Sequence, residues 1–367
     1  MNAIEFNVKL ARSLYLCLNL ILSVLYSYIT VKFISVYNFP IYIILFITTL
    51  IEFFILLDTS YFKIITGIKT KYLYYMLIVF SIVMFIFKSN INITYVLIFY
   101  FVYYLLITIV LLNYNLFVIE ESKSIKAGVT DISIYSNLSK LLGFSLGSYI
   151  YKVNIEEYLI VFIIVFVLFS SLKINNFKNK TEKNSERLVF NNLKRKYIIV
   201  NTALLSGTAV FFIPMFIKQL ATRNLIQYSS IVFFIPGLTV VLFLILTKKY
   251  EINLNNILIS YIILDIVFFI FVICKVFLPL QVILLSLIVA LGVSISIKLG
   301  TNFIKINDKE YRKSILQIFR ISAPLFTIIL SLIGLYLENI AYYILLINIL
   351  SAVHVLYVNL SNNKVIL

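Results

Sequence analysis

The chain has 367 residues, of which 62% are hydrophobic, and its mean hydropathy is +1.05. Soluble domains are usually near half apolar, so this composition excludes an ordinary soluble protein and indicates an integral membrane protein. In a soluble protein the formal net charge of +16 would point to nucleic acid, but basic loops beside membrane spans explain it and we expect no nucleic-acid partner.

Apolar runs long enough to cross a bilayer recur along the whole chain, with polar segments between them. A transmembrane helix needs about 20 mainly apolar residues. The sequence therefore predicts an all-α polytopic membrane protein with twelve transmembrane helices. The predicted spans are residues 14–37, 40–58, 72–88, 91–118, 129–151, 156–172, 197–219, 227–247, 255–275, 278–301, 314–337 and 339–358.

The longest polar segment, residues 173–196, is basic and separates the sixth predicted span from the seventh. We interpret it as a cytoplasmic linker between one six-helix bundle at 1–172 and another at 197–367. Lys and Arg concentrate in this linker and in alternate loops, which predicts that both termini are cytoplasmic. The expected location is the bacterial cytoplasmic membrane.

Polar side chains interrupt several predicted spans, and a polar group in hydrocarbon indicates a functional site unless protein surrounds it. The clearest case is Lys140, in the middle of the span at 129–151. On a helix, Ser133, Asn137, Gly143 and Gly147 share its face, so the span has one apolar side and one small, polar side. Two interpretations remain open: a cavity lysine that attracts an anionic solute, or close helix packing on the glycines with a fixed ion pair.

Several other predicted spans also contain polar or charged side chains. The first span contains Asn19 and Tyr26, the fourth Tyr103, and the seventh Asn201. Acidic and basic groups within or at the ends of spans are Glu52, Asp58, Asp265 and Arg320.

The chain offers little for catalysis or metal binding. Cys17 and Cys274 fall in apolar runs without a partner spacing, and His354 is the single histidine of the sequence. No Ser-His-Asp set, paired catalytic carboxylates or phosphate-binding glycine loop occurs in it. We therefore expect no enzyme activity, no metal and no cofactor.

An internal repeat relates the two predicted bundles. At one constant shift of about half the chain, Asn115 aligns with Asn302, Gly147 with Gly334 and Tyr149 with Tyr336. Parallel repeats of six spans are a known transporter architecture, so the bundles are expected to be pseudo-symmetric.

With twelve spans, a basic central loop, this repeat and the passage SIKAGVTDISIYSNLSKLLGFSLGSYIY at 124–151, the sequence resembles the major facilitator superfamily. The segment DTSYFKIITGIKTK at 58–71 keeps Gly67, Lys69 and Lys71 of that family's signature loop. It has Ile64 and Ile65 where the signature has Asp and Arg.

The resemblance implies a monomeric secondary transporter that moves a small solute across the lipid bilayer by alternating access. Spans one, four, seven and ten line the cavity in that family, so Asn19, Tyr26, Tyr103 and Asn201 are expected to join Lys140, Asn137 and Ser133 there. We expect an amphipathic or anionic organic solute, proton coupling and export.

The family's second and eleventh spans meet at the cytoplasmic gate. Glu52, with Asp58, is therefore predicted to pair with Arg320 when the gate is closed. Asp265 in the ninth span is either a proton site or part of a structural pair, and the latter is favoured because that span lies away from the family's cavity.

Three alternatives compete with this interpretation. A lipid-linked oligosaccharide flippase of another superfamily has a similar composition and two-lobed symmetry. A membrane enzyme such as a polysaccharide polymerase would need a large loop or a charged catalytic cluster. A non-transporting accessory or immunity protein would have an apolar central cavity.

Overall fold

The protein is mainly helical in the part of the chain that the computed structural model describes. This part comprises residues 3–36, 41–58, 67–86, 93–122, 124–153, 193–250, 252–306 and 340–361, with scattered groups of one to three residues between them. Its α-helices are α1 (Ala3–Ser35), α2 (Ile41–Leu57), α3 (Thr70–Ile86), α4 (Ile93–Glu121), α5 (Ile125–Val153), α7 (Leu193–Thr222), α8 (Ser229–Lys249), α9 (Leu254–Ile273), α10 (Leu278–Ile306) and α12 (Ile340–Ser361). A short 3-10 helix, η3 (Ile226–Tyr228), precedes α8.

Each of these ten α-helices overlaps one predicted span, although α1 begins at Ala3, well before the predicted start at residue 14. The agreement follows from length, because an apolar run of about 20 residues forms a helix wherever backbone groups cannot reach water. In the remaining two spans, at 156–172 and 314–337, only scattered residues are described, so neither predicted helix can be compared along its length.

Seven described helices are long and apolar enough to cross a membrane: α1, α4, α7, α8, α9, α10 and α12. Helix α5 has 29 residues but is not among them, since charged and small polar side chains run along its length. A helix of this composition is stable in a membrane only when protein covers its polar side.

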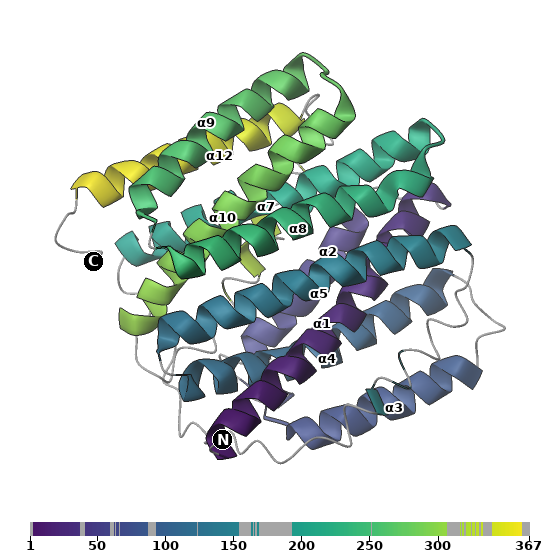
Figure 1. Ribbon diagram of the computed structural model, residues 1–367. Helices are drawn as coiled ribbons and strands as arrows, with labels where there is room; N and C mark the ends of the chain where they lie inside the picture. The colour runs from purple at the N-terminus through teal and green to yellow at the C-terminus, as the bar shows by residue number, and fades with distance from the viewer. Residues whose placement is uncertain are drawn as a thin grey trace.

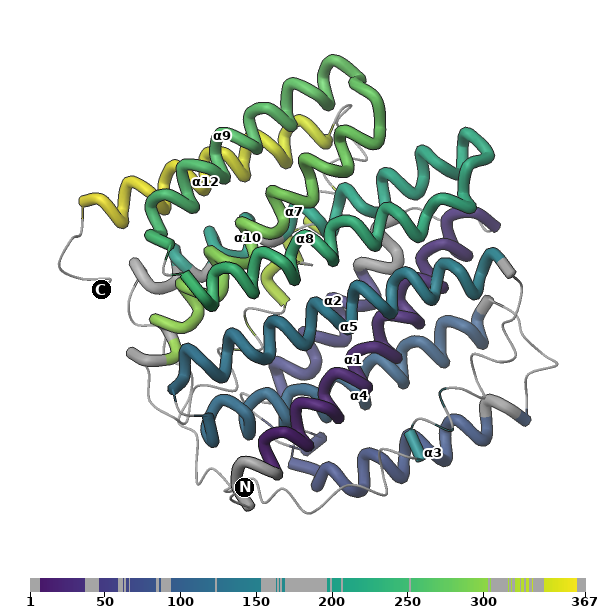
Figure 2. The backbone as a smooth tube through the Cα atoms, viewed as in Figure 1, coloured from purple at the N-terminus to yellow at the C-terminus, as the bar shows by residue number. Residues whose placement is uncertain are grey.

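The helices form one bundle in which α5 and α8 lie side by side along its middle (Figure 1). On one side of this pair are α1, α4 and, at the edge, α3, and on the other are α10, α9 and α12 (Figure 2). Buried apolar residues form two main clusters, one from Ala11 to Val167 and one from Leu205 to Val355. We call the helices from α1 to α5 the N-terminal half and those from α7 to α12 the C-terminal half.

Helices α1 and α5 are parallel and in close contact. The Asn19 side-chain amide donates hydrogen bonds to the carbonyl oxygen of Ser136 at 3.0 Å and to its hydroxyl at 3.2 Å. A methyl group on Gly143 would stand 2.6 Å from the Cβ of Ser23, which is closer than packed carbon atoms approach. Gly143 and Gly147 thus let the two backbones meet, as small residues four apart do in membrane helix pairs.

Helix α5 also contacts the C-terminal half along an antiparallel seam with α8. Leu141 packs on Gly237, where a methyl group would stand 3.0 Å from the Leu141 Cα. Further along, the rings of Phe144 and Phe233 have centroids 5.2 Å apart. Beyond them, side chains from four helices close the seam: Val31, Ile34, Ile217 and Phe233, with Tyr151 against them.

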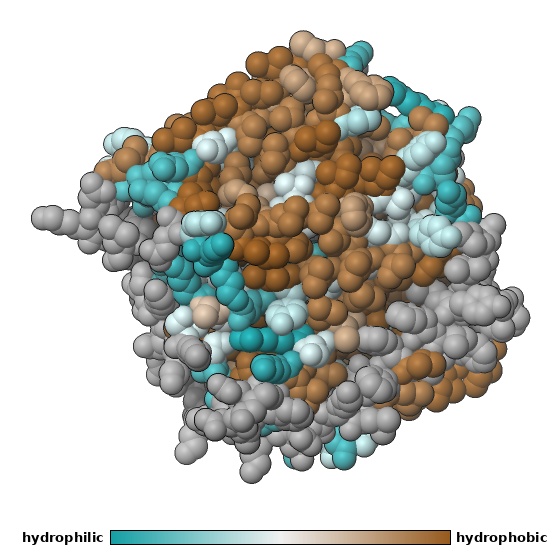
Figure 3. All heavy atoms as spheres, viewed as in Figure 1, coloured by the Kyte–Doolittle hydropathy of each residue, from teal (hydrophilic) through white to brown (hydrophobic). Residues whose placement is uncertain are grey.

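The surface agrees with a membrane environment. One face of the bundle is covered mainly by apolar side chains, and hydrophilic residues gather toward the helix ends (Figure 3). We call the end at which α1 and α5 begin the basic end, because Lys9, Arg12, Lys126, Lys248 and Lys249 lie there.

Replacing Gly147 by Ala should destabilise the protein. The added methyl group would overlap the Ser27 hydroxyl oxygen and the Val24 carbonyl oxygen, so α1 and α5 would have to separate. Overpacking of this kind costs about 1–3 kcal/mol. Thermal unfolding in detergent measures the loss, with Ser145→Ala as the control because it adds no atom to the same helix. Equal melting temperatures for the two variants would contradict this account of the contact.

Candidate functional site

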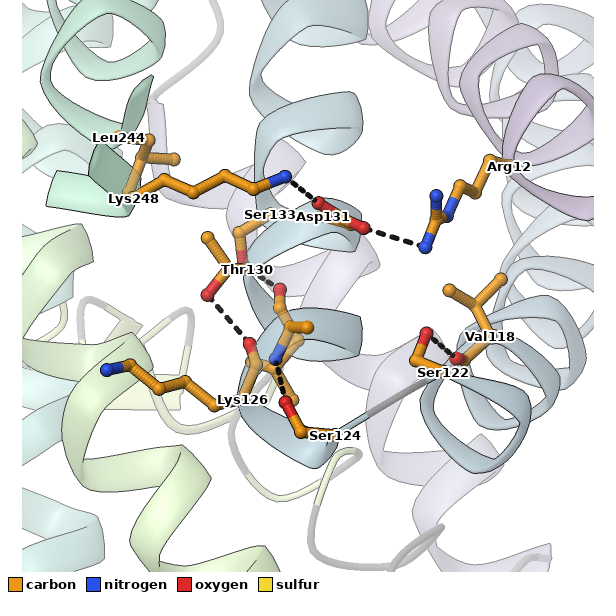
Figure 4. A network of polar contacts seen from close by, with 12 residues as sticks. Arg12, Val118, Ser122, Ser124, Lys126, Thr130, Asp131, Ser133, Leu244 and Lys248 are labelled. Carbon is orange, nitrogen blue, oxygen red and sulfur yellow. Dashed lines mark hydrogen bonds and ion pairs between the residues drawn. The ribbon is translucent and has the colours of Figure 1, made fainter. Parts of the chain in front are cut away.

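At the basic end, one carboxylate joins the two halves of the chain. Asp131, in the second turn of α5, lies between Arg12 of α1 and Lys248 of α8 (Figure 4). An Arg12 guanidinium nitrogen is 2.7 Å from Oδ2 of Asp131. The Lys248 ammonium is 2.6 Å from Oδ1. We call these three residues the ion triad.

The two arms of the ion triad differ in exposure. The Arg12 side chain is 23% exposed and that of Asp131 12%, whereas the Lys248 side chain is 53% exposed. Buried pairs are costly to break, and exposed pairs contribute little. The arm within the N-terminal half is therefore the stronger one, and the arm that crosses to the C-terminal half is the one that can open at small cost.

Sequence reasoning missed the ion triad. In the sequence, Arg12 and Lys248 counted only toward the basic charge beside the predicted spans, and Asp131 was not predicted as a site residue. The available signal was an acidic residue at the start of a span on a strongly basic side. Its partners could not be identified from that signal, because they are more than a hundred residues away along the chain.

Lys140 is exposed, although it lies on the side of α5 that is opposite to the outward-facing residues of this helix. Leu142, Leu146 and Tyr149 have exposed fractions of 41%, 45% and 54% and mark the outer side. At 3.6 residues per turn, Lys140 lies about 120–180° away from them around the helix. Phe144, one turn further along, contacts the rings of Tyr26 in α1 at 5.6 Å and Phe233 in α8 at 5.2 Å.

Lys140 therefore faces the seam between α1 and α8, about 13 Å along α5 from Asp131. The glycines on its helix are in contact with α1, so the packing that we considered for Gly143 and Gly147 does exist. It does not bury the lysine, because the glycines turn toward α1 while Lys140 stays exposed between the two halves.

The other predicted cavity residues on α1 and α5 differ in their burial and in their contacts. Ser133 and Asn137 are half-buried beside Lys140 on α5 and bond to their own helix, at Val129 and Ser133 respectively. Asn19 is buried in the contact with α5, and Tyr26 is half-buried.

Two further predicted cavity residues are buried, Tyr103 on α4 and Asn201 on α7. Tyr103 is fully buried, its ring 4.5 Å from that of Phe99 and 5.7 Å from that of Phe80. Asn201 is buried on α7 and donates to the Tyr197 carbonyl oxygen at 2.9 Å.

The acidic residues of the predicted gate are buried in the N-terminal half. Glu52 on α2 is 2% exposed and accepts a hydrogen bond of 3.1 Å from the Tyr104 hydroxyl of α4. Asp58 accepts hydrogen bonds from the backbone N–H groups of Ile64 and Ile65, at 2.9 and 3.2 Å. Arg320, their expected partner, lies outside the described residues.

Asp265 is fully buried in α9, deep within the C-terminal half. Among the described residues, neither of its carboxylate oxygens has a hydrogen-bond partner. The structural pair favoured for this residue therefore has no counterpart in that part of the chain.

Replacing Asp131 by Asn should lower stability more than either cation replacement, since it removes both arms of the ion triad. Arg12→Gln should come next and Lys248→Gln last, the latter costing below about 1 kcal/mol because that pair is exposed. Thermal unfolding of the purified variants measures the order.

Lys249→Gln is the control for this series, since Lys249 is an exposed neighbour on α8 outside the ion triad. If Lys248→Gln were as destabilised as Asp131→Asn, or if all variants unfolded like the control, the ion triad would not join the halves as described.

Neither a family model nor a curated protein matches the sequence. Solved structures of transporters do match nearly the whole chain in fold. The nucleoside transporter NupG has a TM-score of 0.60 at 16% identity, with 99% of this chain and 100% of that one covered. The human organic anion transporter MFSD10 (TETRAN) has a TM-score of 0.63 at 12% identity, with 96% and 100% covered. The E. coli fucose:proton symporter FucP has a TM-score of 0.60 at 14% identity, with 97% and 98% covered.

Proposed function

Because the chain has the fold of the major facilitator transporters, we propose that it is a secondary transporter that works by alternating access. The solved structures that share this fold are transporters and not enzymes. The shared fold also speaks against the flippase and polymerase alternatives, which belong to other superfamilies.

One observation carries the proposal: the seam between the halves combines a breakable ionic contact at the basic end with an exposed lysine further along. The Lys248–Asp131 arm of the ion triad links α8 to α5 and is half-exposed. In alternating access the two halves, residues 1–172 and 197–367, rock against each other, so contacts of this kind must form and break once per cycle. The basic end corresponds to the cytoplasmic side in the orientation expected from the loop charges.

The proposed solute is an amphipathic or anionic organic molecule. Lys140 presents a positive charge between α1 and α8, and the rings of Tyr26 and Phe144 lie close by on the same seam. A charged hydrogen bond from the lysine would hold an anionic group, and the rings would contact the apolar part of the solute. The similarity in fold to an organic anion transporter is in keeping with this solute class.

Lys140→Ala should reduce transport of organic anions by about tenfold or more, since a hydrogen bond to a charged group contributes about 1.5–3 kcal/mol. Proteoliposomes with an imposed pH gradient measure it, using fluorescent organic anions beside uncharged nucleosides and sugars. Lys140→Arg should retain most activity. Lys152→Ala is the control, since it removes an exposed lysine from the end of the same helix.

Proton coupling and export are the finer parts of the proposal. Glu52 is a buried carboxylate whose hydrogen bond to Tyr104 holds it between α2 and α4. Its proposed role is to bind the coupling proton and to pair with Arg320 across the gate. A net outward flux against a concentration gradient would establish export.

Glu52→Gln should make transport independent of the pH gradient, because an amide cannot release a proton. Arg320→Gln tests the other side of the proposed gate. Tyr104→Phe is the matched control: it removes the hydrogen bond to Glu52 and leaves the carboxylate in place. Wild-type transport and pH dependence in both Glu52→Gln and Arg320→Gln would exclude the gate.

A further inference from the structure

The C-terminal half contains a group of buried polar side chains near the middle of its helices. Thr208 belongs to α7, Tyr261 and Asp265 to α9, and Asn348 to α12. Their exposed fractions are 1% for Thr208 and 0% for the other three. We call these four residues the inner polar cluster.

Hydrogen bonds connect Asn348, Thr208 and Tyr261, and Asp265 lies about one turn from Tyr261 on α9. The Asn348 side-chain amide donates a hydrogen bond to the Thr208 hydroxyl oxygen. The Tyr261 hydroxyl donates to the Leu205 carbonyl oxygen at 3.2 Å, and it interacts with Thr208 and with the Asp265 charge. The cluster is thus a connected set drawn from three helices.

A fourth helix, α10, covers the cluster through a glycine. A methyl group on Gly292 would stand 2.9 Å from the Leu205 carbonyl oxygen and 3.4 Å from Cε2 of Tyr261. Only a residue without a side chain lets α10 approach the polar groups this closely.

Three oxygen atoms of the cluster have no hydrogen-bond partner among the described residues: Oδ1 and Oδ2 of Asp265 and Oδ1 of Asn348. The amide oxygen of Asn348 can accept a hydrogen bond or bind a cation. The two oxygens of Asp265 can do the same when the carboxyl is ionised. An ionised carboxylate buried without a partner is among the costliest arrangements in a protein, and more so within a membrane. We therefore expect the Asp265 carboxyl to be neutralised, either by a proton or by a bound cation.

The single negative charge of Asp265 and the oxygen atoms around it limit which ion can neutralise this carboxylate. A single carboxylate is neutralised by one positive charge, while a divalent ion would leave an excess charge buried. A proton would neutralise Asp265 directly. Sodium ion, which like other hard cations prefers oxygen ligands, could be shared between the carboxylate and the Asn348 oxygen.

We propose that the inner polar cluster is a binding site for one monovalent cation, H⁺ or Na⁺, held by the Asp265 carboxylate. The site lies within the C-terminal half and is distinct from the ion triad and from Lys140. The proposal concerns ion binding, so it stands or falls independently of the transported solute.

Other titratable groups on the helices around Asp265 must be considered in a test that varies pH. Tyr261 is next to it, and Tyr342 of α12 packs its ring on Phe269, one turn further along α9. His354 of α12 stacks on Tyr197 of α7 toward the basic end, and Lys298 of α10 donates to the Ile252 carbonyl oxygen there. The comparison of wild type with Asp265→Asn removes their contributions, because both proteins contain them.

The test is the melting temperature of the purified full chain in detergent between pH 5.5 and pH 9, in choline chloride or NaCl of equal ionic strength. In choline, wild type should lose stability as the pH rises and the proton leaves Asp265, by about 2 °C or more. If Na⁺ binds, NaCl should restore that loss at high pH. Asp265→Asn, which is neutral at every pH and nearly the same size, should respond to neither.

Asn348 provides a second variant with a matched control on the same helix. Asn348→Ala removes a cluster oxygen and should weaken a response to Na⁺. Asn359→Ala removes an amide that bonds to Asn255 outside the cluster and should leave that response unchanged.

The outcomes separate the two ions and can overturn the site. A pH response without a Na⁺ response, absent from Asp265→Asn, identifies a proton; a Na⁺ response absent from Asp265→Asn identifies Na⁺. Equal responses in wild type and Asp265→Asn, or none in either, would overturn the proposal. Should Asp265→Asn fail to fold, infrared difference spectra of wild type decide instead: the absence of any carboxyl band that changes with pH or Na⁺ would equally overturn it.

Discussion

The contact of α5 with α1 on one side and with α8 on the other holds the described part of the protein together. Helix α5 carries three lysines, an aspartate and many small polar residues, and such a helix is unstable against lipid. Its glycines bring it onto the α1 backbone, and its seam with α8 covers a second side. The polar side of α5 is thereby placed between the halves, where the proposed solute would bind.

The strength of the ion triad suits a contact that has to be reversible. A fully buried ion pair between the halves would resist separation, since an unpaired charge would be left in a medium of low dielectric constant. Here the Arg12–Asp131 arm is the more buried one and stays within the N-terminal half. If Lys248 moves away in the proposed transport cycle, Asp131 keeps one cation, and Lys248 is exposed enough to be hydrated. Each charge thus retains a favourable partner in both arrangements.

The sequence was sufficient to locate the ten described α-helices but not to predict their polar contacts. Span limits follow from local hydrophobicity, so α4 and α10 begin and end within a few residues of the predicted runs. Gly143 and Gly147 also indicated close helix packing, because their spacing of four residues places both on one face of the helix. Partners are a different matter: the Asn19–Ser136 and Arg12–Asp131 contacts depend on how α1 crosses α5, which periodicity does not encode.

Asp131 and Asp265 are both buried carboxylates, and their different locations suit them to different roles. Asp131 lies between the halves, so the energy of its interactions would change in the proposed rocking of the halves. Asp265 lies inside one half, so rigid-body rocking alone leaves its surroundings unchanged. Any coupling between an ion at Asp265 and transport would therefore require a change within the C-terminal half itself. Helices α7 and α10 are the places for it, because Pro214 removes a backbone donor from α7 and Gly292 leaves α10 without a side chain at the cluster.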